Sequence, residues 1–178
     1  TTCFAFVGDS TFFASAITGV VNAVYNQANM VLVVLDNSTT AMTGHQPHPG
    51  TGRTVMGEIV QKINIEQVLR GIGVTEIETI NPLELEASVS CVKRMAEKSG
   101  VRAIIFKAPC IAVTKPKAPL HVDQDSCIGC KKCIRDLGCP AIVMNDGKIC
   151  IDASMCTGCH LCSQVCPVCA IAGGDDYE

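Results

Sequence analysis

Two runs of closely spaced cysteines constrain this sequence more than any other feature. In each run, three cysteines stand at two-residue steps and a fourth follows later, directly before a proline. They are Cys127, Cys130, Cys133 and Cys139 in the first run, and Cys156, Cys159, Cys162 and Cys166 in the second. Spacings this tight suit metal ligation better than disulfide bonds. The segment that holds them is therefore expected to fold around inorganic groups.

The spacing predicts iron–sulfur clusters. The second run matches the bacterial ferredoxin signature, including the proline after its fourth cysteine. By resemblance to ferredoxins, the first three thiolates of each run bind one cubane and the fourth binds the other cubane, which gives two [4Fe–4S] clusters. Structural zinc is the alternative, because repeated C-x-x-C also binds zinc. Zinc ribbons, however, need neither the third cysteine nor the Cys-Pro step.

The first run departs from the signature in one respect. Its gap between Cys133 and Cys139 is five residues long, whereas the second run has three residues at this place. The longer gap leaves open weak ligation by Cys139 or a three-iron cluster. The remaining cysteines lie in apolar contexts without partner spacing, and we expect most of them to be small buried side chains. They are Cys3, Cys91, Cys110, Cys150 and Cys169.

The part of the chain before the cysteines alternates between strand and helix patterns, which predicts an α/β fold with a parallel sheet. Strands are expected at 2–7, 30–35, 74–80 and 101–106, and helices at 11–27, 65–71 and 82–98. The pattern breaks between Ala108 and Pro119, a stretch that contains three prolines. We therefore expect an α/β domain over residues 1–113 and a small α+β, ferredoxin-like domain over residues 114–178.

Composition excludes several partners and locations. The net charge is −3 and no Lys/Arg run is present, so the sequence offers no basic surface for nucleic acid. The longest apolar run, Met30 to Leu35, is too short to span a bilayer, and the first residues lack a signal-peptide pattern. Because the sequence starts directly in a strand without a methionine, we expect it to be the C-terminal part of a longer protein. Reduced cysteines indicate the cytoplasm.

Two predicted strands end in residues suited to a bound phosphate and Mg²⁺. Gly8-Asp9-Ser10 ends one strand and opens a helix, where backbone N–H groups favour a phosphate and the Asp9 carboxylate suits Mg²⁺. The next strand ends at Asp36-Asn37, so neighbouring parallel strands would bring Asn37 and Asp9 to the same edge of the sheet. The local pattern also allows a simpler interpretation, in which Asp9 is only a helix N-cap.

This pair of elements resembles the Gly-Asp-Gly and Asn-Asn motif of the thiamine diphosphate enzymes, with Ser10 and Asp36 in place of a glycine and an asparagine. The resemblance implies that Asp9, Asn37 and the main-chain carbonyl of Thr39 bind Mg²⁺. The cofactor-binding residues that it implies are Gly8, Asp9, Ser10, Asn37, Thr39, Met42, Thr43 and Gly44.

A thiamine diphosphate domain followed by two [4Fe–4S] clusters resembles the 2-oxoacid:ferredoxin oxidoreductases, and most of all the α subunits of those that act on indolepyruvate. Three stretches carry the resemblance, at residues 3–13, 35–47 and 138–140. It implies oxidative decarboxylation of an arylpyruvate with coenzyme A, with electrons passing to external ferredoxin. It also implies a β subunit and a missing N-terminal part of the α subunit, where the glutamate that activates the cofactor is expected.

The segment at residues 38–56 is long for a connection and has no helical or strand periodicity, which indicates a functional loop. Met42 stands where pyruvate-using relatives have asparagine, and methionine suits an aryl substrate, with ordinary loop packing as the alternative. His45 and His48 either touch substrate or diphosphate, or are solvated. Two competing functions share these motifs: another 2-oxoacid oxidoreductase, and a non-enzymatic electron carrier whose α/β domain is only a docking platform.

The cysteine runs yield a first test. Protein prepared without oxygen is expected to contain about eight iron and eight sulfide per chain, because two cubanes need four of each. Iron and sulfide analysis with a visible absorption spectrum measures this. Stoichiometric zinc without broad visible absorption would contradict the assignment.

Overall fold

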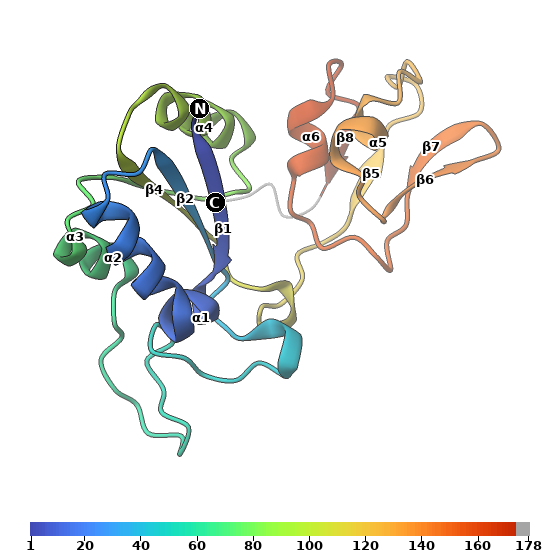
Figure 1. Ribbon diagram of the computed structural model, residues 1–178. Coiled ribbons are helices and arrows are strands. Elements are labelled where there is room, and N and C mark those ends of the chain that lie inside the picture. Colours follow the sequence, from blue (N-terminus) through green and yellow to red (C-terminus); the bar gives the residue numbers. More distant parts are fainter. Residues whose placement is uncertain (174–178) are drawn as a thin grey trace. The chain divides into compact units, whose positions relative to one another are not determined.

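The computed structural model describes residues 1–173, which form two compact units (Figure 1). The first unit is Thr1–Val113 and the second begins at Thr114. Each unit has its own sheet structure and its own buried side chains, so each is described separately. No helix among the described residues is long and apolar enough to cross a membrane.

The first unit contains a four-stranded parallel sheet in the order β1-β2-β4-β3. The strands are β1 (Cys3–Gly8), β2 (Met30–Asp36), β3 (Glu76–Ile80) and β4 (Val101–Lys107). Val31 to Val34 of β2 are all buried, as expected for a branched run covered on both faces of a parallel sheet. The predicted parallel α/β fold is confirmed.

Helices cover both faces of this sheet (Figure 1). The predicted helix at 11–27 is a continuous helical segment that begins earlier, at Asp9, and includes a π-helical turn. Its parts are α1 (Asp9–Thr11), η1 (Phe12–Ala16) and α2 (Ile17–Tyr25), and the later helices are α3 (Ile65–Ile72) and α4 (Leu85–Glu97). The sheet thus has α2 and α3 on one face and α4 on the other.

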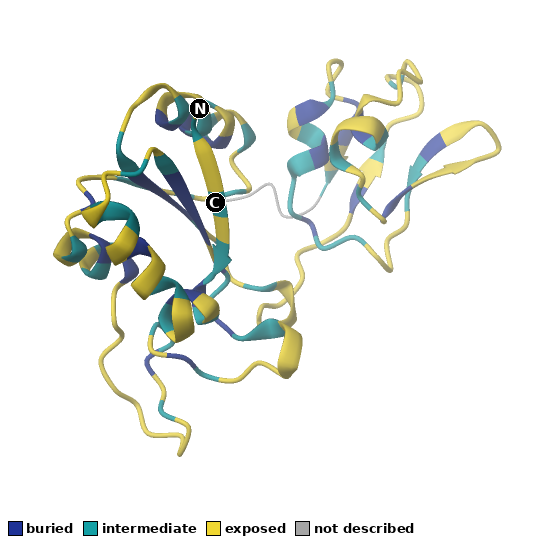
Figure 2. Ribbon diagram, viewed as in Figure 1, coloured by how far each residue is buried: buried dark blue, intermediate teal, exposed yellow. Residues whose placement is uncertain are grey.

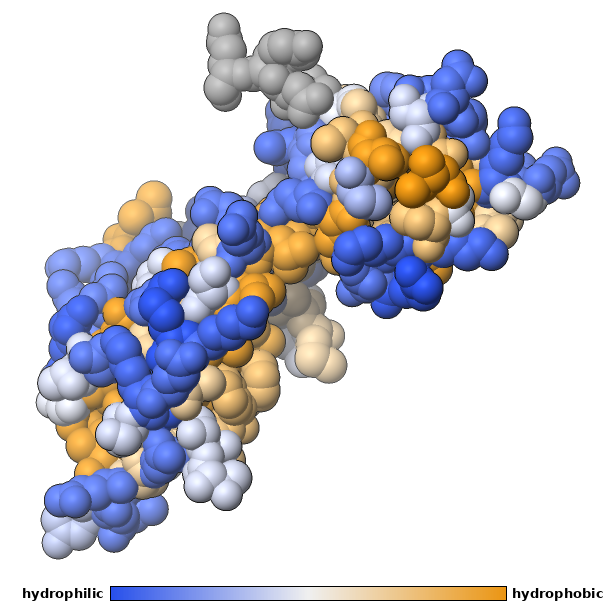
Figure 3. All heavy atoms as spheres, turned by 90° about the horizontal axis from the view of Figure 1, so that it is seen from above, coloured by the Kyte–Doolittle hydropathy of each residue, from blue (hydrophilic) through white to orange (hydrophobic). Residues whose placement is uncertain are grey.

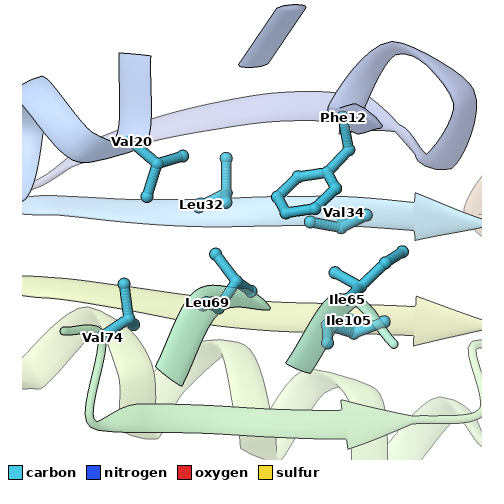
Figure 4. Packing of buried hydrophobic residues seen from close by; sticks show 9 residues of the cluster. Phe12, Val20, Leu32, Val34, Ile65, Leu69, Val74 and Ile105 are labelled. Carbon is cyan, nitrogen blue, oxygen red and sulfur yellow. The ribbon is translucent and has the colours of Figure 1, made fainter. Parts of the chain in front are cut away.

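Two apolar clusters hold these layers together. On one face, Phe12, Val20 and Leu69 pack from the helices against Val34 and other strand residues (Figure 4). On the other face, residues of α4 pack against β2 and β4. Burying each large apolar side chain stabilises a fold by roughly 1.5–3 kcal/mol. The central strands β2 and β4 are mostly buried (Figure 2). The clusters therefore fix the strand ends, and with them the residues that follow each strand.

The second unit is a small α+β fold with an internal repeat. Strand β5 (Leu120–Val122) pairs with β8 (Ile171–Gly173), and β6 (Ile142–Asn145) pairs with β7 (Lys148–Ile151), both antiparallel. Helix α5 (Lys132–Leu137) contains the third cysteine of the first run, and α6 (Leu161–Val165) contains that of the second. The last five residues of the predicted domain, 174–178, lie outside the described part.

The expectation that the spare cysteines are mostly buried is wrong. Only Cys91, which packs between α4 and the sheet, is fully buried. Cys3 and Cys169 are exposed, whereas Cys110 and Cys150 are intermediate. Apolar neighbours in the sequence did not predict burial, because Cys3 lies on the edge strand β1 and Cys169 has a positive φ of 51° in a turn.

Apolar surface is visible on each unit among the polar residues (Figure 3).

Candidate functional site

Asp9 links the first strand, the first helix and the following loop. Gly8, not Asp9, is the N-cap residue, so the simple helix-cap interpretation is not what the structure shows. Asp9 is 2% exposed, and its carboxylate accepts the N–H of Ser10 through Oδ1 and the N–H of Ser38 through Oδ2, both at 2.8 Å. The carboxylate therefore lies between the start of the helix and the loop after β2.

The other two predicted Mg²⁺ ligands lie at the same edge of the sheet. Gly8 pairs with Leu35 in the parallel register of β1 and β2, so Asp9 and Asn37 both follow the carboxyl ends of neighbouring strands. Oδ1 of Asn37 accepts the N–H of Thr39 at 3.1 Å, and Thr39 is buried. Structure and sequence thus place a carboxylate, an amide and a main-chain carbonyl at one edge, which are the oxygen donors that Mg²⁺ prefers.

Ser10 and Asp36, the two residues that depart from the thiamine diphosphate motif, both take part in local contacts. Thr40 Oγ1 donates to Ser10 Oγ at 3.0 Å, which joins the helix to the loop. Asp36 Oδ1 accepts the N–H of Ser38 at 3.1 Å, and its Oδ2 lies 3.2 Å from Lys107 Nζ. Ser10 and Asp36 therefore help to fix the first residues of the loop, and neither disrupts the arrangement of the predicted ligands.

The electrostatics of Asp9 suit a cation. Burial raises the pKa of the Asp9 carboxyl above its usual value, and the charge of Asp36 adds to this rise. Hydrogen bonds from Ser10 and Ser38 and the nearby His48 ring oppose it. A buried carboxylate that is destabilised in its charged form gains most from a bound cation. The residues present therefore fit Mg²⁺.

His48 is a member of this site that the sequence left ambiguous. Its ring is buried, and Nε2 lies 3.2 Å from Asp9 Oδ2. Nδ1 accepts the N–H of Gly50 at 3.2 Å, and the ring packs against Phe13 at a centroid distance of 5.8 Å. The distance to Asp9 is that of an ion pair, yet Nε2 has no aligned hydrogen-bond partner among residues 1–173. His48 thus supports the carboxylate from within the fold rather than being solvated.

The remaining cofactor candidates lie on an exposed turn. Residues 40 and 46 form an isolated antiparallel bridge, and the 3₁₀ turn η2 (Ala41–Thr43) lies between them. Met42 is 99% exposed, which contradicts ordinary loop packing. Thr43, Gly44 and His45 are also exposed. Contact of Met42, Thr43 and Gly44 with a cofactor or a substrate stays a prediction.

A cavity of about 330 Å³ is lined by His48, the residue that contacts Asp9, and sequence reasoning missed this cavity. Asp36, Thr79 and Lys107 border it from the carboxyl ends of β2, β3 and β4, and His48 and Lys62 border it from the loop. Ligands in parallel α/β sheets bind at this edge. The rule that located Asp9 and Asn37 could also have found Lys107, because it closes β4.

In the second unit, the fourth cysteine of the second run lies with the first run. A mostly apolar cavity is lined by Cys127, Cys130, Cys133 and Cys166, with Val122, Ile149 and Ile171 among its walls. Burial raises the pKa of the Cys133 thiol, and the nearby Cys130 and Cys166 add to the rise. The N–H of Ala170 donates to Cys166 Sγ at 3.3 Å. This grouping is the crossed one that the ferredoxin pattern implies.

The complementary group forms around the second run. Burial raises the pKa of Cys162 to about 11, and Cys159, Cys156 and Cys139 add to the rise through their charge. Cys139 therefore lies near the second run in spite of the longer gap before it. No three His, Cys, Asp or Glu side chains among residues 1–173 converge on a position for a single metal ion. Thiols grouped in this way suit a cluster of several irons, whose ligands lie further apart.

Comparison with known proteins matches each unit to a family. The C-terminal TPP-binding domain of thiamine pyrophosphate enzymes matches residues 1–106, and the 4Fe-4S dicluster domain matches residues 120–167. The chain belongs to the thiamine pyrophosphate enzymes. The cofactor is the thiamine diphosphate predicted from residues 8–10 and 36–37, and the second match supports iron–sulfur clusters over zinc.

The chain is also similar to curated proteins named indolepyruvate oxidoreductase subunit IorA. It is 46% identical to that of Methanothermobacter thermautotrophicus over 94% of this chain, and 40% identical to that of Archaeoglobus fulgidus over the same share. It spans only 27% and 28% of the length of these two relatives. A solved structure described as "X-ray structure of a putative thiamin diphosphate-dependent enzyme isolated from Mycobacterium smegmatis" aligns over 61% of this chain and 18% of its own, with a TM-score of 0.43 and 22% identity.

The crossed grouping of cysteines predicts a selective effect of Cys139→Ser. The cluster of the second run is expected to lose an iron or become unstable, while that of the first run keeps its spectrum, because Cys139 lies with Cys156, Cys159 and Cys162. Electron paramagnetic resonance with iron analysis measures both clusters. Cys166→Ser is the matched variant and should affect the first-run cluster instead. If Cys139→Ser damaged only the first-run cluster, the assignment of both fourth ligands would be wrong.

Proposed function

We propose that this chain is the part of a 2-oxoacid:ferredoxin oxidoreductase that holds the diphosphate of thiamine diphosphate and conducts the electrons away. The reaction is that of a 2-oxoacid, coenzyme A and two oxidised ferredoxins, giving the acyl-CoA, CO₂, two protons and two singly reduced ferredoxins. One observation carries the proposal: a chain with the Asp9 and Asn37 site in its first unit has two groups of four cysteines in its second.

In this function, Asp9, Asn37 and the carbonyl of Thr39 would hold Mg²⁺, whose charge would offset that of the diphosphate. Thiamine diphosphate, when bound, supplies the carbanion chemistry of decarboxylation. The protein's own residues position it. Ser10 and Ser38 orient the Asp9 carboxylate through their N–H groups, and His48 limits its movement from the other side. The glutamate that activates the cofactor is expected outside this chain.

The eight cysteines hold two [4Fe–4S] clusters in this proposal. Oxidation of the substrate releases two electrons, whereas ferredoxin accepts one, so the protein must pass them on singly. Buried thiols such as Cys133 and Cys162 favour the protonated state without metal, so loading the clusters releases protons. Each cysteine would then bind one iron atom as a thiolate. The first-run cavity in which this happens has mostly apolar walls.

An arylpyruvate, such as indolepyruvate, is the substrate that we favour. The support is the similarity to indolepyruvate oxidoreductase subunits and the exposed apolar side chain of Met42. A methionine of this kind adapts to an aromatic ring. The whole reaction requires the remainder of the α subunit and a β subunit, because this chain spans about a quarter of its relatives.

Substitution of Asp9 tests this function. In the full-length enzyme, Asp9→Ala is expected to weaken Mg²⁺-dependent binding of thiamine diphosphate by more than about 100-fold, since loss of even an outer-shell partner costs roughly 10–100-fold. Isothermal titration calorimetry measures the affinity, and the visible spectrum of the clusters should stay unchanged. Asp125→Ala, at an exposed carboxylate of the second unit, is the control and should bind normally. Unchanged affinity in Asp9→Ala would contradict the proposed cofactor site and favour the alternative, a non-enzymatic electron carrier.

A further inference from the structure

The two cysteine loops have the same backbone form but differ in exposure. Gly129 and Gly158 have φ of 64° and 67°, and Lys131 and His160, which precede the short helices, have φ of 59° and 61°. In the first loop, residues 128–131 are all exposed, Ile128 to 65%. In the second loop, Gly158 is buried and residues 157, 159 and 160 are intermediate. An internal repeat therefore has one open copy and one covered copy.

The covered copy is closed by the segment that leads into β5. The N–H of Lys117 donates to the carbonyl of Thr157 at 3.3 Å. A Cβ placed on Gly158 would lie 2.7 Å from Ala118 O and from Lys117 Cβ, so this backbone approaches the loop directly. At Gly129, an added Cβ would meet no heavy atom of the described residues within 4 Å. The difference is thus built into the chain's own packing.

Exposure decides where an electron can leave. Electron transfer between proteins falls steeply with the distance between the redox groups, so a partner must come close to the cluster that it oxidises. Cys130 is exposed and lines the first-run cavity, together with Ile128 and Lys131. No described segment of the second unit covers this loop at Gly129, whereas residues 117 and 118 cover the second loop at Gly158.

Three basic and three acidic side chains surround residues 128–132, but the charged one that lines the first-run cavity is Lys131, which favours an acidic partner. Lys131, Lys132 and Arg135 lie within and just after the loop, and Arg135 donates to the carbonyl of Cys130 at 3.3 Å. Lys132 is paired with Asp136. Two further acids, Asp123 and Asp125, precede the loop, and Asp123 accepts a hydrogen bond from Ser126.

Lys131 lines the first-run cavity together with Ile128. A small apolar centre with a charged rim is typical of short-lived protein contacts, in which the rim charges set the association rate.

We propose that residues 128–132, here called the open loop, are the docking surface for an acidic electron-carrier protein, and that electrons leave the protein through the first-run cluster. This inference rests on the proposed function, which supplies the electrons. One electron passes from the protein to the carrier at each encounter. The protein is oxidised by one electron and the carrier is reduced by one, without any bond being made or broken.

Charge reversal in the full-length enzyme tests the open loop. The probe is an acidic [2Fe–2S] ferredoxin, whose oxidised form is titrated for binding and mixed with dithionite-reduced enzyme in a stopped-flow instrument. Lys131→Glu is expected to weaken binding and to slow the bimolecular reduction by on the order of tenfold at low ionic strength. The difference from wild type should shrink as salt screens the charges. Lys131→Gln should give a smaller effect in the same direction.

Lys117→Glu is the matched control, because it makes the same change of charge beside the second loop. It should keep binding and rate within about twofold of wild type, since its charge lies away from the rim that sets association. Unchanged cluster spectra show that all variants are folded and loaded. If Lys117→Glu slowed transfer and Lys131→Glu did not, the exit would be at the second run. If neither variant changed binding or rate, the open loop would not be the docking surface.

The readouts separate this inference from the proposed function. Dithionite replaces the 2-oxoacid as electron source, so the experiment needs neither thiamine diphosphate nor substrate. An enzyme that shows the Lys131 effect but does not oxidise 2-oxoacids would support the docking surface and contradict the function. An enzyme that oxidises 2-oxoacids with a small dye as acceptor, yet is insensitive to Lys131→Glu, would overturn the docking surface alone.

Discussion

The buried Asp9 carboxylate is the contact on which the first unit's site depends. It accepts N–H groups from the helix that follows β1 and from the loop that follows β2, and it lies against His48 from further along the same loop. Burial in this position raises the pKa of the Asp9 carboxyl, so a bound cation would stabilise its charged form. The same interaction fixes the loop, so under the proposed function folding and Mg²⁺ binding would be coupled at one residue.

The second unit is organised by its thiols in a comparable way. Its two sheets have two strands each, and its helices have six and five residues, so little of it is held by regular structure alone. In the crossed grouping, each half of the repeat contributes one cysteine to the group of the other half. Metal loading in such a unit is expected to supply part of its folding free energy. Residues 117 and 118 cover the second cysteine loop at Gly158, whereas the first loop is open at Gly129, so the two halves of the repeat differ in exposure.

Sequence reasoning reached the features that depend on spacing and strand order. The resemblance of the cysteine runs to ferredoxins implied the crossed groups, and the strand-end rule placed Asp9 and Asn37 at one edge of the sheet. Features that depend on tertiary contacts were out of reach. Neither the His48–Asp9 contact nor the Ser10–Thr40 hydrogen bond has a local pattern, because each joins a helix to a loop at least 30 residues later. The cover of Gly158 by residues 117–118 likewise follows from packing alone.

The most direct measurement of the central claim is pulsed electron paramagnetic resonance of Mn²⁺, used in place of Mg²⁺, in the full-length enzyme with thiamine diphosphate. Asn37→Ala is compared with wild type, because Asn37 is a proposed ligand that carries no charge. Wild type is expected to show bound Mn²⁺ coupled to the phosphorus of the diphosphate, and Asn37→Ala to lose most of this signal. Mn²⁺ bound with the same phosphorus coupling in both proteins would contradict a metal site at the ends of β1 and β2.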